Sequence, residues 1–313
     1  MRILEPVLNL QTGKGVGTDF STPNLVSVSI ASDGNPTWDN TTVYNLDDVV
    51  TYGFINYKAL GTTTAGAIPS DTPLEWLATG YENRYKMFDG STRSLSQDPD
   101  NDIVVVMNSR GITTLSFFSV IATTVHIVMT DPIDGVVYDK TLNTNIAGSV
   151  DGGIVNWYQY FFNGFPDAAT TADMVIDDLP NYGNAEISIT FDAGIVGLRQ
   201  VGLIVAGRPQ TIGDTDYGTS VGVVDYSLKT VNSFGDFTVV ERAFSKRAEY
   251  DITLDTDRVS VVRKRLIQLR TTPCLYIGNK DYESTIIFGY FKDFDIVLED
   301  FYTSSCTLTV EGL

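Results

Sequence analysis

The side chains that most often carry out catalysis are few in this chain. Hydrolases of the Ser–His–Asp or Cys–His type need a histidine as base, and the sequence has one, His126. It lies in a strand-like run between Val125 and Ile127, with no nucleophile motif nearby. The alternation predicts a structural or surface histidine rather than a catalytic base.

Paired carboxylates are the second possible source of chemistry, because glycoside hydrolysis needs two of them. The chain has 39 Asp and Glu residues, so an adjacent pair by itself indicates little. We interpret Asp47-Asp48, Asp177-Asp178 and Glu299-Asp300 as acids of turns and strand ends. The prediction is that the chain is not an enzyme, and a polysaccharide depolymerase is kept as an alternative.

The two cysteines, Cys274 and Cys306, each lie inside a strand-like run. They have no CxxC spacing and no histidine cluster beside them, which excludes thiol redox chemistry and a zinc site. Two buried free thiols are expected, with a disulfide as the alternative.

A cluster of aromatic residues between residues 35 and 80 indicates binding instead of bond breaking. A flat ring suits the C–H face of a sugar, so such rings can carry the affinity of a glycan site. In so small a unit the same rings could all be core. The rings of the cluster are those of Trp38, Tyr44, Tyr52, Tyr57 and Trp76.

Composition and charge limit the partners. The 313 residues carry a formal net charge of −18, with a pI near 4.3, so the surface repels phosphate backbones and nucleic acid is not expected as a partner. No segment has the roughly 20 apolar residues that span a bilayer, so no membrane contact is predicted. The first residues lack the apolar core of a signal peptide, and we expect synthesis in the cytoplasm.

The elements that would position these residues are mostly strands. Short runs rich in Val, Ile, Thr, Tyr and Phe recur along the chain between Asp-Gly and Asp-Pro turns, which predicts a mainly β fold with sandwich or jelly-roll organisation. The runs are 25–30, 103–107, 114–120, 124–129, 136–138, 157–162, 186–191, 201–205, 220–224, 236–240, 248–254, 285–290, 294–298 and 306–310.

One segment breaks the strand pattern. Val259, Val262, Leu266 and Leu269 recur at helical spacing, which predicts one helix over about 256–270. Asp255 or Thr256 is expected to cap its start, and Thr272-Pro273 to end it.

The length and the changes of pattern predict four parts. Residues 1–34 form an N-terminal arm, 35–80 a small aromatic module, 81–208 a β-sandwich and 209–313 a β-rich C-terminal domain with the helix. The Gly13–Gly17 stretch of the arm lacks the GK[ST] ending of a phosphate loop and is interpreted as flexible.

The aromatic module resembles the small chitin-binding modules of bacterial chitinases (carbohydrate-binding family 5/12 type). The residues that carry this resemblance are Trp38, Tyr44, Asp47-Asp48-Val49-Val50, Tyr52-Gly53, Tyr57-Lys58-Ala59, Pro69 and Trp76. The resemblance implies a small twisted sheet held by aromatics, with exposed rings that stack on sugars. It makes Trp38, Tyr44, Tyr52, Tyr57 and Trp76 the candidate carbohydrate-binding residues. The sequence departs from the family at Asp47, where the family has glycine, and at Leu60–Thr64, where it has exposed tryptophans.

The 81–208 region resembles a galactose-binding-like jelly roll. The residues that carry this are Lys86-Met87-Phe88-Asp89-Gly90-Ser91 at its start and the closing run Val201–Gly207. The resemblance implies an entry loop that often holds a structural Ca²⁺, to which Asp89 could contribute one ligand. A simple Asp-Gly turn is preferred, and no cofactor is predicted.

Taken end to end, the chain resembles tail and baseplate structural proteins of tailed bacteriophages. The residues that carry this resemblance are Asn83–Gly90, Gly213–Gly222, Asp225-Tyr226-Ser227, Phe234–Arg242 and Cys306–Leu313. It implies a virion location, contacts with other tail or baseplate proteins, and several copies assembled as a homo-oligomer. A host-surface glycan-binding protein is the alternative, because function has to be argued from a site.

Overall fold

The computed structural model divides the chain into two compact units, which are described separately. Unit 1 comprises Met1–Val7 and Ala206–Leu313, and unit 2 comprises Leu8–Val205. The division into 1–34, 35–80, 81–208 and 209–313 stays a prediction. The structure describes residues 1–6, 24–144, 172–192, 198–231, 235–280 and 282–313.

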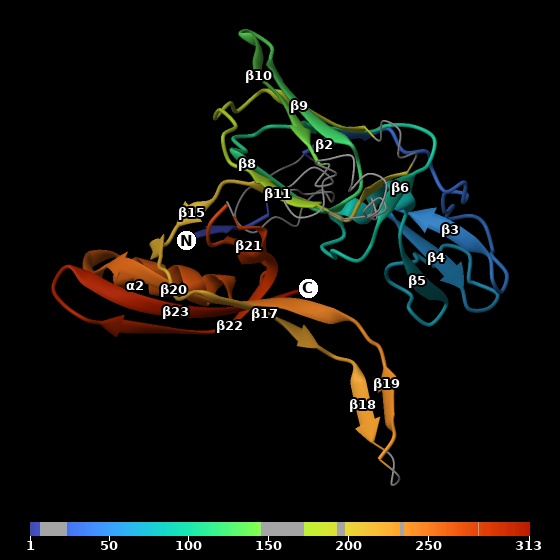
Figure 1. The fold of residues 1–313 in the computed structure, drawn as a ribbon. Coiled ribbons are helices and arrows are strands. Elements are labelled where there is room, and N and C mark those ends of the chain that lie inside the picture. Colours follow the sequence, from blue (N-terminus) through green and yellow to red (C-terminus); the bar gives the residue numbers. More distant parts are fainter. Residues whose placement is uncertain (7–23, 145–171, 193–197, 232–234, 281) are drawn as a thin grey trace, which may run out of the picture. The chain divides into compact units, whose positions relative to one another are not determined.

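Unit 1 is built on an eight-stranded antiparallel sheet (Figure 1). Its longest strands, β22, β23 and β20, are neighbours, and β17 pairs with β20 beside β16. In sheet order the strands are β15 (Gln210–Thr211), β1 (Arg2–Leu4), β21 (Cys274–Ile277), β22 (Ile286–Leu298), β23 (Thr303–Gly312), β20 (Phe244–Asp255) and β16 (Asp214–Thr215), with β17 (Ser220–Asp225) off this path.

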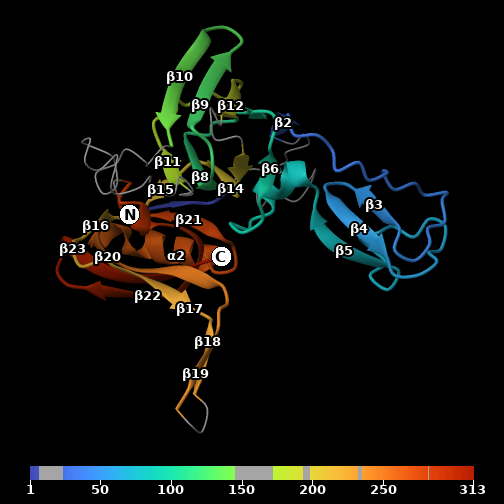
Figure 2. The ribbon, with the colours of Figure 1, turned by 45° about the vertical axis from the view of Figure 1, so that its right-hand side comes forward.

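A single α-helix among the described residues covers one face of this sheet (Figure 2). A 3-10 turn, η3 (Thr256–Arg258), leads into α2 (Val259–Leu269), which confirms the helix predicted over 256–270. Val262, Leu266 and Leu269 pack into a core with side chains of β20, β21 and β23. The predicted cap is wrong, because Asp255 makes no side-chain cap bond and the Thr256 hydroxyl bonds the Asp300 carbonyl.

Strand β1 shows that the first residues belong to the sheet of unit 1. It pairs antiparallel with both β15 and β21, and Ile3 and Leu4 are buried. Three residues are too few to give a periodic signal, so the sequence did not predict this strand. The Gly13–Gly17 stretch lies outside the described residues.

Unit 2 contains a β-sandwich, as predicted. Phe117 of the three-stranded sheet meets Phe191 of the five-stranded sheet edge-on, with 5.4 Å between ring centroids. The five-stranded sheet has the order β10 (Gly135–Asn143), β9 (Thr124–Asp131), β12 (Glu186–Asp192), β7 (Ile103–Asn108) and β2 (Leu25–Val28). The three-stranded sheet has the order β11 (Ala172–Ile176), β8 (Thr114–Val120) and β14 (Leu203–Gly207).

The remaining elements are small. A three-stranded sheet forms the aromatic module, and two further strand pairs and two 3-10 helices complete the described elements. They are β3 (Val49–Tyr52), β4 (Ile55–Ala59), β5 (Trp76–Tyr81), β6 (Ser96–Asp98) with β13 (Arg199–Val201), β18 (Leu228–Val231) with β19 (Phe237–Val240), η1 (Asn83–Phe88) and η4 (Glu283–Thr285).

The mainly β fold is confirmed, with differences in detail. The run 201–205 is divided at Gly202, where an added Cβ would lie 2.8 Å from the Ser119 Cβ. The runs 285–290 and 294–298 form one strand, β22, with a bulge between Phe291 and Asp293. The run 157–162 lies outside the described residues. None of the helices within the described ranges has the length and apolar character needed to cross a bilayer.

Candidate functional site

Three of the five candidate sugar-binding rings form the core of the aromatic module. Tyr44, Tyr57 and Trp76 are 8%, 8% and 2% exposed. Trp76 meets Tyr44 edge-on at 5.2 Å, and its Nε1 donates a hydrogen bond to the Ala67 carbonyl at 3.1 Å. These rings are used to close a small sheet, so their faces are covered in the folded module.

Trp38 and Tyr52 lie at the edge of that core. The two rings meet edge-on at 5.3 Å and pack against the buried cluster, and both stay partly exposed. The Trp38 amide donates to the Thr51 carbonyl, which fixes the start of the module against β3. Of the five predicted residues, these two keep surface that a ligand can reach.

At Asp47, where the sequence departs from the chitin-binding pattern, the backbone adopts a conformation that suits glycine. Asp47 has a φ of 71°, in the left-handed region that glycine adopts most easily. Its carboxylate forms an ion pair with Lys58 at 2.7 Å. The turn therefore keeps the geometry that a glycine would give, and the aspartate adds a link to β4.

Asp89 occupies a turn in the structure. Its Oδ1 accepts the Ser91 amide at 2.7 Å, and Gly90 follows with a φ of 81°. In the part of the chain that the structure describes, no three His, Cys, Asp or Glu side chains gather as a metal site would require. The turn matches the preferred interpretation of Asp89-Gly90, and the calcium role that the jelly-roll resemblance implied for Asp89 is untested.

Two of the acids named from the sequence, Asp300 and Asp178, accept hydrogen bonds from neighbouring residues. Asp300 accepts the amides of Tyr302 and Thr303, and these bonds keep its pKa below the ordinary value. Burial raises the pKa of Asp178, but hydrogen bonds from Lys140 and Tyr138 outweigh it and the net pKa is lowered.

His126 lies on β9 between two buried residues, as the alternation predicted, and its Nε2 lies 2.8 Å from Asp139 Oδ1.

The segment Gly218–Gly222 matches the GxSxG pattern of a nucleophile motif, which was not among the sequence predictions. In the nucleophile motif the serine sits on a sharp turn between a strand and a helix. Here Ser220 begins β17 and lies opposite Glu249 of β20. The match therefore lacks the context of that motif.

Both cysteines are free and buried, as expected. Burial raises the pKa of Cys274 to about 12 and that of Cys306 to about 11. The thiols are therefore protonated at neutral pH and poor nucleophiles.

The hairpin of β18 and β19 exposes apolar side chains. Every described residue of both strands is exposed, including Val231 at 57%, Phe237 at 77% and Val239 at 60%. Among the described strands each pairs with the other alone, and the hairpin extends from the end of β17 away from the sheet of unit 1 (Figures 1 and 2). Its base is held by Asp225, which bonds Lys229 Nζ and the Ser227 amide.

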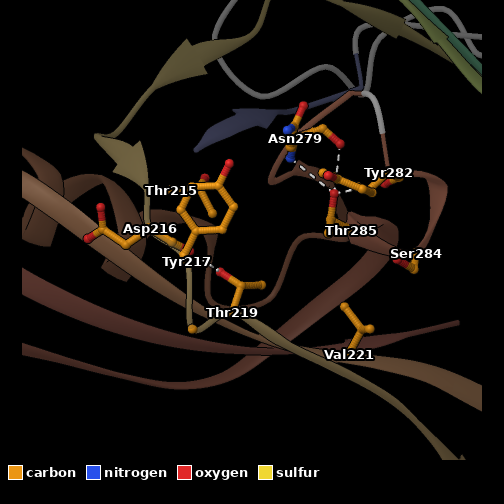
Figure 3. A pocket seen from close by; sticks show the side chains of 10 residues that line it. Thr215, Asp216, Tyr217, Thr219, Val221, Asn279, Tyr282, Ser284 and Thr285 are labelled. Carbon is orange, nitrogen blue, oxygen red and sulfur yellow. Dashed lines mark hydrogen bonds between the residues drawn. The ribbon is translucent and has the colours of Figure 1, made fainter.

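Unit 1 also has an open pocket of about 380 Å³. Tyr217, Thr219 and Val221 line one side, and Asn279, Tyr282 and Ser284 line the other. Figure 3 shows the Tyr217 ring, while the Asp216 carboxylate points away from the other lining residues and accepts a hydrogen bond from Thr253 Oγ1 at 2.6 Å. Tyr217 is fully exposed and Tyr282 is 58% exposed.

Hydrogen bonds hold both loops of this pocket. The Thr285 hydroxyl accepts the Asn279 amide at 3.0 Å, and the Thr285 carbonyl accepts the buried Tyr250 hydroxyl at 2.9 Å. Thr215 Oγ1 donates to the Gly278 carbonyl at 3.1 Å and links the two loops. These bonds anchor the described backbone on both sides of the pocket, at Thr215 and at Gly278, Asn279 and Thr285.

No family model and no curated protein sequence matches the chain. Among solved structures, the chain is similar to CBM32-1 from a family 31 glycoside hydrolase of Clostridium perfringens. The identity is 12% and the TM-score 0.25, over 40% of this chain and 83% of that chain. A likeness at this level supports no statement about function.

The sequence reading did not select the two tyrosines of the pocket. Tyr217 lies in an Asp-Tyr-Gly turn between two strands, and Tyr282 lies between a Lys-Asp pair and Glu283. Turn residues around a ring do not by themselves indicate exposure, since Trp76 also follows turn residues and is 2% exposed. Only the tertiary structure brings residues 217 and 282 to the same pocket.

Proposed function

We propose that the chain is a non-enzymatic structural and adaptor protein of a phage tail or baseplate, which assembles through the β18–β19 hairpin. The exposed apolar hairpin is the observation that carries this proposal. An isolated two-stranded hairpin is marginally stable in water, and free strand edges pair readily with other chains. The likeness to tail proteins noted in the sequence supports the virion as its location.

Both faces of the hairpin carry apolar side chains, which supports a partner that contacts both faces. Val231, Phe237 and Val239 share one face with Lys229, and Leu228 and Val240 lie on the other. Apolar patches of this kind mark protein contacts, and strand edges add backbone hydrogen bonds to them. The proposed partners are other tail or baseplate proteins and further copies of this chain.

Peptide analysis of purified particles of the encoding phage tests the location. We expect this chain in stoichiometric amount, and its absence from the particles contradicts the proposal. In a second test, particles are assembled with V231S/F237S/V239S in place of the native chain. Incorporation should fall strongly, whereas Val261→Ser, at a 66% exposed position of α2, should be incorporated normally.

Host-glycan recognition by the aromatic module is the second candidate, favoured by the partly exposed Trp38–Tyr52 pair. Trp38→Ala should abolish retention on host polysaccharide while the module stays folded. If retention persists, or if the module unfolds, this candidate fails. Release of reducing sugar from the polysaccharide would instead indicate a depolymerase.

A further inference from the structure

We propose that the pocket between Tyr217 and Tyr282 in unit 1 binds a neutral saccharide. This site is separate from the aromatic module and does not depend on the assembly function. Its volume of about 380 Å³ lies at the lower end of the range for small-ligand pockets, which suits a short stretch of glycan.

The composition of the pocket selects the class of ligand. Two tyrosine rings offer flat surfaces, on which the C–H face of a pyranose packs, and their hydroxyls add a polar edge. Thr219, Asn279 and Ser284 supply hydroxyl and amide groups, which act as both donors and acceptors. Val221 is the aliphatic member of the lining and adds apolar surface beside the two rings.

Charge excludes the anionic sugars. None of the described residues that line the pocket is Lys or Arg, and the Asp216 carboxylate is turned toward Thr253. The chain as a whole has a formal net charge of −18. A sialic acid or a sugar phosphate would enter without a counter-charge in the pocket and against the charge of the protein.

The backbone supports a preformed site. Tyr250, buried in the core, holds the Thr285 carbonyl, and Thr215 joins the two loops through Gly278. A loop fixed before binding loses less conformational freedom when the ligand arrives. Tyrosine adds large contact area with two rotatable bonds, so its ordering also costs little.

Saturation-transfer NMR on the full chain tests the proposal. The probes are the methyl glycosides of galactose, glucose, mannose and N-acetylglucosamine, together with N,N′-diacetylchitobiose and 3′-sialyllactose, each at about 10 mM to detect millimolar binding. We expect saturation transfer to the ring C–H protons of at least one neutral probe and none to the sialylated one. Transfer to no probe, or to the sialylated probe alone, overturns the proposal.

Variants locate the site. Tyr217→Ala and Tyr282→Ala should each weaken binding of the responding probe by about tenfold, the loss of one stacked ring. Tyr302→Ala, at a 77% exposed tyrosine outside the pocket, should leave binding within about twofold. Unchanged binding in both pocket variants overturns the proposal.

Two other outcomes also decide against it. Binding that is lost in Trp38→Ala but kept in Tyr217→Ala assigns the sugar to the aromatic module. If no probe binds while Tyr217→Ala impairs incorporation into particles, the pocket is a protein contact and the saccharide proposal fails.

Discussion

The aromatic module and the β18–β19 hairpin are both small antiparallel sheets, but they place their large side chains in opposite environments. The module has a third strand and a long loop, and it buries Tyr44, Tyr57 and Trp76 against each other. The hairpin has two strands, and Phe237 is 77% exposed. Two strands cannot enclose a ring. The buried rings of the module therefore stabilise the fold, whereas the exposed ring of Phe237 is available to a partner.

The largest effect is expected at Trp76. Trp76→Ala removes a ring that is 2% exposed and the hydrogen bond to Ala67, at a cost of about 3–5 kcal/mol. A sheet of three short strands cannot absorb that loss, so the module should become open to limited proteolysis between residues 38 and 81. Leu74→Ala, at a 92% exposed position of the same module, is the matched control and should leave it protected.

A smaller effect on stability is expected at Asp47, which forms a turn of the aromatic module. Its φ of 71° disfavours most side chains, so Asp47→Ala should reduce the free energy of unfolding by about 1 kcal/mol. Asp47→Gly relieves the backbone but loses an exposed ion pair with Lys58, which contributes about 0–1 kcal/mol. In denaturant unfolding, Asp47→Gly should therefore have a free energy of unfolding close to that of the wild type, and Asp47→Ala a lower one. If Asp47→Ala is more stable than Asp47→Gly, the role given to this turn is contradicted.

Little effect on folding is expected at the hairpin. Phe237→Ser changes a side chain that makes no core contact, so the free energy of unfolding should change by less than about 0.5 kcal/mol. The midpoint of denaturant unfolding checks this. A loss comparable to that of Trp76→Ala would show that the hairpin packs against its own chain and would remove the distinction between the two sheets.

The smallest effect concerns pH at the base of the hairpin. Hydrogen bonds from Lys229 and Ser227 hold the pKa of Asp225 well below its usual value. The ionised carboxylate therefore stabilises the base above the usual Asp range, and this contribution is lost as the pH falls through the lowered pKa. The protection factors of the β18 and β19 amides, which are corrected for the intrinsic slowing of exchange in acid, should fall on acidification, and Asp225→Asn should show the lower protection factors at every pH.

The sequence was enough to predict the mainly β fold, the helix and the longer strands such as β9, β12, β20 and β23. These features depend on local periodicity. Val262, Leu266 and Leu269, for example, lie on one face of a helix because of their spacing alone, independently of the rest of the fold. Resemblance also located the compact aromatic module. Strand β1 and the continuity of β22 were not predicted. Whether a three-residue segment forms a strand, and whether a bulge interrupts a long one, depends on pairing with strands that are distant in the sequence.

Which aromatic residues are available for binding was decided by the tertiary structure alone. Trp76 and Tyr217 are both aromatic residues near turns, and nothing in their local sequence separates a buried ring from an exposed one. The first is enclosed by residues of its own module, whereas the second stands on a loop that long-range hydrogen bonds fix beside Tyr282. Burial is a property of what surrounds a side chain, and those surroundings come from parts of the chain far away in sequence.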